Sequence, residues 1–309
     1  MAVAVKTEGL TKTYHLSMQN TPVNAVTNLD LEVHEGEIFG FLGPNGAGKT
    51  TTIKMLLGLT YPTSGQAWIL GEPAGQINVK KRISYLPESP YFYEYMTGKE
   101  ALEFYARLFG MKKDAYNAKV DELLNTVGLH PHRNKPLNQY SKGMLQRVGI
   151  AQALVNDPEL LFFDEPTSGL DPIGHSEVQD LILSLKQMGK TVFLSSHQLS
   201  DVELVCDRVA IMNRGDLLKL GTLDEMLVAG YVEIKCENLC PDCLKQLEPQ
   251  VAKITCGQDG CHVLMLHEGD CVNTAVDTIR AFKGKLIYVI PQRRTLEDLF
   301  VEIITEGNK

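Results

Sequence analysis

A glycine-rich segment that ends in a lysine and two threonines is the part of the chain best suited to hold a phosphorylated ligand. The segment fits the pattern G-x-x-x-x-G-K-[ST] and consists of Gly43, Pro44, Asn45, Gly46, Ala47, Gly48, Lys49, Thr50 and Thr51. Its glycines allow bare backbone to approach phosphate oxygens. Lys49 would then reach the β- and γ-phosphates of a nucleotide, and the Thr50 hydroxyl would bind Mg²⁺. The pattern therefore predicts a phosphate-binding P-loop.

The segments on either side are those that such a loop requires. Glu37–Leu42 has the composition of a buried strand, and Thr51–Leu57 has that of a helix start. A helix that begins here points the positive end of its dipole at a bound phosphate. The alternative is a glycine-rich turn with a chance lysine, which leaves the flanking strand and helix without a purpose.

Two adjacent carboxylates follow a second apolar segment. Leu160–Phe163 is uninterrupted, which suits a central parallel strand covered on both faces, and Asp164 and Glu165 stand at its end. Asp164 is the expected partner of Mg²⁺, through a water molecule. Glu165 would then lie beside the γ-phosphate, where a general base activates the hydrolytic water. The alternative is that the pair only caps the following turn.

Two further residues depend on their surroundings for a role. His197 ends the apolar segment Thr191–Ser196, and a strand-end histidine taken alone is more often structural. Its place at the carboxyl end of an expected parallel strand, beside two strands that carry phosphate chemistry, favours a contact with the phosphate. Tyr14 is compatible with stacking on a purine base and equally with an ordinary place in a strand.

Composition limits the class of protein and its compartment. The 309 residues include 30 Lys and Arg against 38 Asp and Glu, a net charge of −8, so no nucleic acid is expected as a partner. The N-terminus lacks the basic segment and apolar core of a signal peptide, and no apolar run approaches the roughly 18 residues of a membrane span. These features predict a cytoplasmic protein.

The expected elements divide the chain into two domains. Residues 1–228 would form an α/β domain with a helical insertion at about residues 90–150, and residues 229–309 would form a small α+β domain. The first domain is expected to open with two strands, Val3–Thr7 and Leu10–Tyr14, joined by a turn.

Two helices of the first domain carry expected boundaries. Ser141 is expected to cap a helix over Met144–Leu154, and the turn at Ser168–Pro172 is expected to lead into a helix over Ser176–Met188.

The residues after 230 contain all but one of the seven cysteines. Their segments alternate in the order strand, helix, strand, strand, helix, strand. Cys240 and Cys243 form one close pair and Cys256 and Cys261 a looser one, with Cys236, His262 and Cys271 nearby. Two such pairs could supply a tetrahedral Zn²⁺ site. The alternative is a set of unliganded thiols, since buried cysteine also behaves as a small hydrophobic residue.

Taken in order, these motifs resemble those of the ATPase subunit of an ATP-binding-cassette (ABC) transporter, of the bacterial exporter type, over residues 3–226. The resemblance rests on the P-loop, a signature-like segment, a Walker B segment, a following loop and a switch histidine, which are residues 43–51, 140–144, 160–165, 168–171 and His197. It implies an α/β fold: a P-loop NTPase core with a mixed sheet and a helical signature subdomain. The small C-terminal α+β domain and the segment Thr295–Phe300 are similar to the tail of exporter-type ATPases.

The resemblance also implies how the sites are used. In this family two subunits close head to tail around two ATP molecules, and a homodimer is expected here. Ser141 and Gly143 would bind the γ-phosphate held by the partner's P-loop, His197 would hold the same phosphate, and Asp171 would lie at the dimer seam. Tyr14 matches the family's adenine-stacking position.

Two positions depart from the family pattern. The signature reads Tyr-Ser-Lys-Gly-Met, in which Lys142 either adds positive charge near phosphate or is simply solvated. Glu88 stands where the family has a glutamine that contacts Mg²⁺. A carboxylate there could ligate Mg²⁺ directly but would repel the γ-phosphate.

The leading functional hypothesis is the motor of an exporter, on the cytoplasmic face of the membrane, that drives a separate membrane permease. The expected docking area is residues 88–100, which are rich in aromatic and methionine side chains: Tyr91, Phe92, Tyr93, Tyr95 and Met96. The alternative is that these side chains form the core of the helical insertion. Competing functions are a soluble cassette ATPase that acts on ribosomes or DNA, and a regulatory cassette that does not hydrolyse ATP.

Overall fold

The computed structural model describes residues 2–15, 22–227, 231–257, 261–267, 272–292 and 295–306. Its contacts divide the chain into two compact units, Met1–Thr222 and Leu223–Lys309, whereas the sequence placed the boundary between residues 228 and 229. Each unit is described by itself.

The first unit is built on a six-stranded sheet in the order β10-β9-β3-β8-β7-β6. All neighbours are parallel except β10, which runs antiparallel to β9, so the sheet is mixed as expected. The strands are β3 (Ile38–Leu42), β6 (Ile83–Leu86), β7 (Leu160–Asp164), β8 (Thr191–Ser196), β9 (Arg208–Asn213) and β10 (Asp216–Thr222). The carboxyl ends of β3, β7 and β8 therefore lie side by side.

Both faces of this sheet are buried, because successive residues of an apolar strand point to opposite sides. Phe39, Phe162 and Phe193 pack into one core, with α1 (Lys49–Leu56) and a second sheet. Leu161 and Phe163 pack into the other core, beneath the helices of the insertion.

The second sheet has the order β2-β1-β4-β5 and is antiparallel throughout. Its strands are β1 (Val3–Tyr14), β2 (Val23–His34), β4 (Ser64–Ile69) and β5 (Glu72–Pro73). The prediction of two strands with a turn before Tyr14 is wrong, because β1 is one continuous strand. Its register to β2 shifts between Thr7 and Leu10, where Gly9 has a φ of 57°, so the expected turn is an irregularity within the strand.

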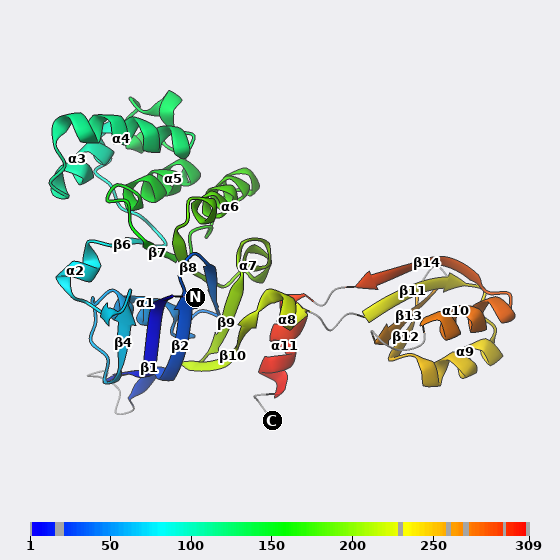
Figure 1. The fold of residues 1–309 in the computed structure, drawn as a ribbon. Helices are drawn as coiled ribbons and strands as arrows, with labels where there is room; N and C mark the ends of the chain where they lie inside the picture. Colours follow the sequence, from blue (N-terminus) through cyan, green and yellow to red (C-terminus); the bar gives the residue numbers. More distant parts are fainter. Residues whose placement is uncertain are drawn as a thin grey trace. The chain divides into compact units, whose positions relative to one another are not determined.

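The helices of the insertion form a group apart from the strands (Figure 1). They are α3 (Gly98–Leu108), α4 (Lys113–Thr126) and α5 (Lys142–Ala153), with single 3₁₀ turns at His130–His132 and Leu137–Gln139. α3 begins with a capping box, in which Thr97 and Glu100 each bond the other's backbone N–H. The remaining helices of this unit are α2 (Ile77–Lys80), α6 (Pro172–Gln187) and α7 (Leu199–Val205).

Two of these helices begin earlier than predicted. α5 begins directly after Ser141, which is its N-cap as expected. α6 begins at Pro172 rather than at Ser176, because Asp171 caps the helix and proline is favourable in a first turn, where no backbone N–H is needed.

The second unit follows the strand and helix order predicted from the sequence. Its elements are α8 (Leu223–Leu227), β11 (Tyr231–Glu237), α9 (Pro241–Leu247), a 3₁₀ turn (Glu248–Gln250), β12 (Lys253–Cys256), β13 (His262–His267), α10 (Val272–Ala281), β14 (Lys285–Gln292) and α11 (Leu296–Glu306). The antiparallel sheet has the order β12-β13-β11-β14, which with the two helices is the split βαβ arrangement of ferredoxin-like folds.

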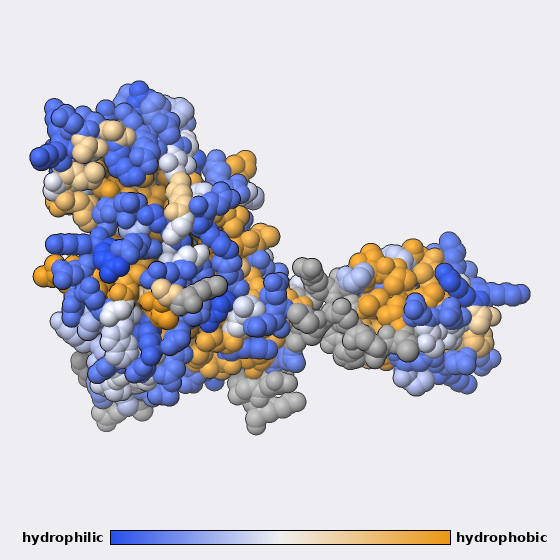
Figure 2. Space-filling model, viewed as in Figure 1, coloured by the Kyte–Doolittle hydropathy of each residue, from blue (hydrophilic) through white to orange (hydrophobic). Residues whose placement is uncertain are grey.

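The core of this unit lies on one face of its sheet. Ile234 and Leu264 are fully buried there beside Ala275 and Ile279 of α10. Figure 2 shows apolar residues gathered over β11 and β14, where Ile287 and Ile290 are 42% and 45% exposed. The helices therefore leave part of the apolar surface of β14 in contact with solvent.

Candidate active site

The P-loop joins the carboxyl end of β3 to α1 and is held by close backbone contacts. Gly48 is the N-cap of α1 in a left-handed conformation with φ 105°, and a β-carbon there would collide with the carbonyl of Ala25. The N–H of Ala47 donates to the carbonyl of Pro44 at 3.1 Å, and the N–H of Gly43 donates to the carbonyl of Ser196 at 3.3 Å. The loop therefore needs glycine at position 48 for both conformation and space.

Lys49 is 6% exposed and lies within the loop. Its Nζ donates to the carbonyl of Gly43 at 2.7 Å and lies 3.1 Å from Oε1 of Glu165. The contact with Glu165 is an ion pair but not a hydrogen bond. Oε1 is buried and has no hydrogen-bond partner among the described residues. An ammonium held here can meet phosphate oxygens, and the unpartnered Oε1 can accept a hydrogen bond from water.

Asp164 and Thr50 come together although they are distant in sequence. The Thr50 hydroxyl donates to Oδ1 of Asp164 at 3.3 Å, and the buried Ser195 hydroxyl donates to the same atom at 2.6 Å. Tyr85 donates to Oδ2 at 3.4 Å, and burial raises the pKa of Tyr85 to about 12, an effect strengthened by the negative charge of Asp164. Paired hydroxyl and carboxylate oxygens beside a phosphate-binding loop fit Mg²⁺, which prefers oxygen ligands.

Glu165 has an unusual backbone conformation. Its φ is 52°, in the left-handed region that non-glycine residues rarely adopt, and its N–H donates to the carbonyl of Ser195 at 3.1 Å. His197 Nδ1 donates to Oε2 of Glu165 at 2.6 Å, and the His197 N–H donates to the same oxygen at 3.2 Å. The carboxylate is thus oriented by the neighbouring strand's end and lies between Lys49 and the histidine.

A cleft of about 470 Å³ lies over the P-loop. It is lined by Val23–Ala25 of β2, by Pro44–Thr51, and by the carboxylates of Glu88 and Glu165, with Arg214 at its edge. Of the predicted site residues, the structure therefore brings together the P-loop, Asp164, Glu165, His197 and Glu88.

Sequence reasoning missed Ser195, Tyr85 and Arg214. Ser195 is a polar residue in an otherwise apolar strand, which was a signal available in the sequence. Arg214 occupies the turn between β9 and β10 with φ 49°, and the next residue, Gly215, donates its N–H to the carbonyl of Ala47 at 3.0 Å. The turn is thus bonded to the P-loop. No local sequence pattern predicts this contact.

Of two further predicted site residues, Glu88 lines the cleft and Tyr14 does not. Tyr14 pairs with Val23 across the strands, and Lys12 Nζ lies 5.0 Å from the centre of its ring. The ring is 37% exposed and is not among the side chains that line the cleft. Glu88 accepts a hydrogen bond from the Ser168 hydroxyl at 3.2 Å. Adenine stacking by Tyr14 and Mg²⁺ binding by Glu88 stay predictions.

The signature-like segment forms the start of α5. Ser141 accepts a hydrogen bond from the N–H of Met144 at 3.2 Å, and a β-carbon on Gly143 would lie 3.5 Å from Cα of Gly174 in α6. Lys142 Nζ lies against Gly169 rather than at the P-loop. Ser141, Gly143 and Asp171 do not line the cleft of their own chain. This is the position that a role in a partner's site would require.

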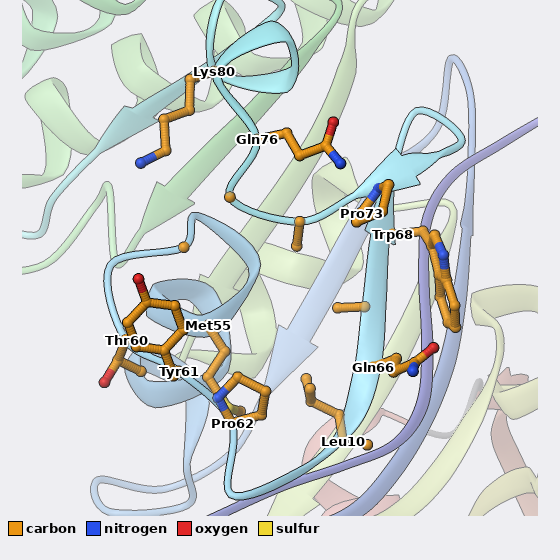
Figure 3. A pocket seen from close by; sticks show the side chains of 15 residues that line it. Leu10, Met55, Thr60, Tyr61, Pro62, Gln66, Trp68, Pro73, Gln76 and Lys80 are labelled. Atoms are coloured by element: carbon orange, nitrogen blue, oxygen red, sulfur yellow. The ribbon is translucent and has the colours of Figure 1, made fainter.

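A larger cavity of about 620 Å³ lies elsewhere in the first unit. Figure 3 shows Met55, Tyr61 and Pro62 at the end of α1 on one side of it and Lys80 and Gln76 near α2. None of the residues that line it belongs to the P-loop or to the carboxylate pair. Size alone therefore does not locate the nucleotide site.

The aromatic segment before α3 is divided between surface and core. Tyr91 and Tyr95 are 84% and 74% exposed, whereas Phe92 is buried and Met96 packs against the core of the insertion. The prediction of a docking surface is therefore wrong for Phe92 and Met96, because the insertion needs their apolar volume.

The cysteines of the second unit do not form the anticipated zinc site within the part of the chain that the structure describes. There, no group of three or more His, Cys, Asp or Glu side chains is arranged to hold a metal ion, and Cys271 lies outside the described residues. Burial raises the pKa of Cys236 to about 11 and also raises that of Cys243. Both therefore behave as buried apolar side chains.

The site combines a phosphate-binding loop, a hydroxyl and a carboxylate suited to Mg²⁺ (Thr50 and Asp164), and a second, oriented carboxylate (Glu165). These features define a P-loop ATPase. The family model for ABC transporters matches residues 26–168. An uncharacterized ABC transporter ATP-binding protein of Nostoc sp. is 43% identical over 97% of this chain and 89% of its own length. The chain belongs to the ATP-binding proteins of ABC transporters and is an ATP-hydrolysing transporter subunit.

Two other comparisons each cover less than three quarters of this chain. The fluoroquinolones export ATP-binding protein of Mycobacterium tuberculosis is 39% identical over 73% of each chain. The dimeric structure of the ATP-binding cassette MJ0796, in a post-hydrolysis state bound to ADP and Pi, has a TM-score of 0.64 and 27% identity, and the match covers 71% of this chain and 98% of that one. Within the described residues, no helix is long and apolar enough to cross a membrane.

Proposed function

We propose that this subunit is the motor of an exporter and that Glu165 is the general base of its ATPase reaction. The observation that carries the proposal is the position of Glu165. One carboxylate oxygen is held by His197 at 2.6 Å, and the other lies 3.1 Å from Lys49 with no hydrogen-bond partner among the described residues. A carboxylate oriented in this way can accept the proton of a water that attacks the γ-phosphate.

ATP binding would rearrange these contacts. Lys49 exchanges Glu165 for the β- and γ-phosphates, and the amides of the P-loop and of the first turn of α1 bind the remaining oxygens. Thr50 and Asp164 would hold the magnesium ion, and the hydrogen bonds from Ser195 and Tyr85 orient Asp164. Bound magnesium supplies positive charge that offsets the charge on the β- and γ-phosphate oxygens.

Hydrolysis then depends on the freed Glu165. With Lys49 engaged by phosphate, Glu165 Oε1 is left to the attacking water, and Oε2 stays with His197. The His197 side chain is 39% exposed, so the imidazole would also be accessible to the phosphate. The pair thus keeps the base in place while the histidine contacts the product phosphate.

The active assembly would be a head-to-tail homodimer on the cytoplasmic face of the membrane. Ser141 and Gly143 at the start of α5 would complete the partner's site, and Asp171 would lie at the seam. Ser141 is exposed and lies outside the cleft over the chain's own P-loop, which, with the dimeric state of the MJ0796 structure, supports this arrangement. Tyr14 would stack on adenine from the strand beside Val23.

A separate permease would dock near Glu88. Tyr91 and Tyr95 are the most exposed aromatic side chains of that segment, and Ser168 joins Glu88 to the loop after Glu165, so a push at this surface can reach the site. The export of a fluoroquinolone is recorded in the name of the Mycobacterium tuberculosis relative, which supports the direction of transport.

Steady-state ATP turnover and dimerisation of the full chain test the proposal. Glu165→Gln is expected to lower turnover about 10²- to 10³-fold and to accumulate an ATP-bound dimer, since it keeps the shape but loses the base. Glu122→Gln, an exposed carboxylate on α4, is the control and should behave as wild type. A Glu165→Gln variant with turnover near the wild-type value would refute the role of Glu165.

A further inference from the structure

A buried carboxylate outside the nucleotide cleft joins several of the segments that surround it. Asp201 lies in the first turn of α7, just after His197, and is 4% exposed. Its Oδ2 accepts hydrogen bonds from the Thr167 hydroxyl at 2.6 Å and from His175 Nε2 at 2.9 Å, and its Oδ1 accepts one from Gln179 at 3.4 Å. A buried carboxylate is costly without such partners, so the contacts depend on one another.

The donors come from the loop after the Walker B strand and from α6. Thr167 lies in that loop, and His175 lies in the first turns of α6. His175 Nε2 also lies 3.2 Å from Oε1 of Gln198, the residue that follows the switch histidine. Because both neighbours of Nε2 are acceptors, Nε2 carries the hydrogen. The side chains thus attach the segment of His197 to the loop and to α6.

The same loop and helix contact the signature segment. Gly174, beside His175, packs on Gly143 so closely that a β-carbon on Gly143 would lie 3.5 Å from its Cα. Lys142 Nζ lies against Gly169 in the loop. A continuous set of contacts therefore runs from the segment of His197, through Asp201 and α6, to the start of α5.

We propose that Asp201 is a positioning residue that makes ATP hydrolysis at the two sites of the dimer cooperative. The inference rests on the proposed head-to-tail dimer, in which the signature segment meets the phosphate of the partner. Because His197 bonds the chain's own Glu165, we assign it to the phosphate on its own P-loop and not, as the sequence had suggested, to the partner's phosphate. Asp201 bonds the histidine's segment to both the loop and α6. A shift of His197 on phosphate binding or release is thereby passed to the partner's site.

The chemistry of the contact explains why a carboxylate is needed. Thr167 and His175 both donate to the same oxygen while Gln179 donates to the other, so the group must accept on both oxygens. An alanine at position 201 has no acceptor oxygen. Asp201→Ala therefore removes the contacts with Thr167 and His175 together, which separates the loop from α6.

The test compares Asp201→Ala with Glu37→Ala in the full chain. Glu37 is a matched control because it is a buried carboxylate of the same unit, bonded to Arg208 at 3.0 Å, and it precedes β3 at the end opposite the P-loop. Asp201→Ala is expected to lower the Hill coefficient for ATP from about 2 to about 1, with the Kd of the monomeric subunit for MgATP changed less than about twofold. Glu37→Ala is expected to lose thermal stability and keep its Hill coefficient.

A second variant separates coupling from simple loss of structure. His175→Ala is expected to lower the Hill coefficient as Asp201→Ala does, and the double variant is expected to be no worse than Asp201→Ala, because the two residues act through one contact. Additive losses in the double variant would contradict a shared path.

The outcomes distinguish the inference from the proposal beneath it. A wild-type chain that stays monomeric with MgATP overturns the dimer and the coupling together. A wild-type chain that dimerises and hydrolyses cooperatively, with the same Hill coefficient in Asp201→Ala, overturns the coupling alone. A dimer whose wild-type Hill coefficient is about 1 also overturns it.

Discussion

The nucleotide cleft of the first unit and the cysteine-rich core of the second treat their reactive groups in opposite ways. In the cleft, Lys49 and Glu165 are nearly buried yet keep charged partners, and one carboxylate oxygen is left without a hydrogen bond among the described residues. In the second unit, Cys236 and Cys243 are buried among apolar side chains, and burial raises the pKa of both thiols. In the cleft, Lys49 and Glu165 each have a charged partner, which suits them to reaction with a charged ligand. In the second unit, burial raises the pKa of both thiols, so the thiols stay protonated and unreactive near neutral pH.

The largest expected effect comes from removing the cation of the cleft. Lys49→Ala is expected to lower ATP turnover about 10³-fold, because the phosphates lose the ammonium of the P-loop and Glu165 loses its ion pair. Turnover and MgATP binding by the purified subunit measure this. Lys54→Ala, on the same helix but exposed, is the control. If Lys49→Ala retained activity, the charged pair of the cleft would not be needed for catalysis, and the contrast with the second unit would not hold.

The second unit should respond in stability and not in catalysis. Leu264→Ala is expected to lower the free energy of unfolding of that unit by about 2–5 kcal/mol, because a fully buried leucine leaves a cavity. Hydrogen exchange of the second unit and ATP turnover of the full chain are measured together. Val263→Ala, a neighbour on β13 with a partly exposed side chain, should cost much less. Equal losses for both would contradict the assigned core.

Thiol reactivity sharpens the comparison at the level of single groups. Cys256 is exposed, whereas Cys236 is buried with a pKa of about 11. At neutral pH we expect Cys256 to react with a disulfide reagent about 100-fold faster than Cys236, since the thiolate is the reactive species. Cys256→Ser should remove a fast phase from the reaction of the native chain. A fast phase that persists at Cys236 would show that this core is open to solvent.

The smallest expected effect concerns Tyr85. Tyr85→Phe removes one hydrogen bond to Asp164, worth about 0.5–1.5 kcal/mol. The affinity of the site for Mg²⁺ should therefore fall only a few-fold. Because the pKa of Tyr85 rises from 10.0 to about 12 on folding, its contribution is complete below pH 10 and is lost as the pH rises to 12. Urea unfolding at pH 8 and pH 11 checks the sign: Tyr85→Phe should lose less stability than wild type over that range.

Much of the fold could be predicted because its signals are local. The P-loop, the strand before it and the Walker B strand each depend on neighbours in sequence, and the strand and helix order of the second unit followed from alternation and helical spacing. The errors were also local ones. The turn expected before Leu10 became an irregularity in one long strand, because pairing with β2 continues past Gly9. The start of α6 was predicted too late because Asp171, assigned to the dimer seam, is also the N-cap of this helix.

The amino-acid sequence was enough to predict a nucleotide-phosphate site to which Asp164, Glu165 and His197 contribute, since glycine spacing and strand ends carry that information without any tertiary contact. Only the folded chain decided that Lys49 and His197 share Glu165, that Ser195 and Tyr85 support Asp164, and that Asp201 joins the loop after the Walker B strand to α6. Those contacts link residues far apart along the chain, so their partners are chosen by the packing of the sheet and not by any local pattern.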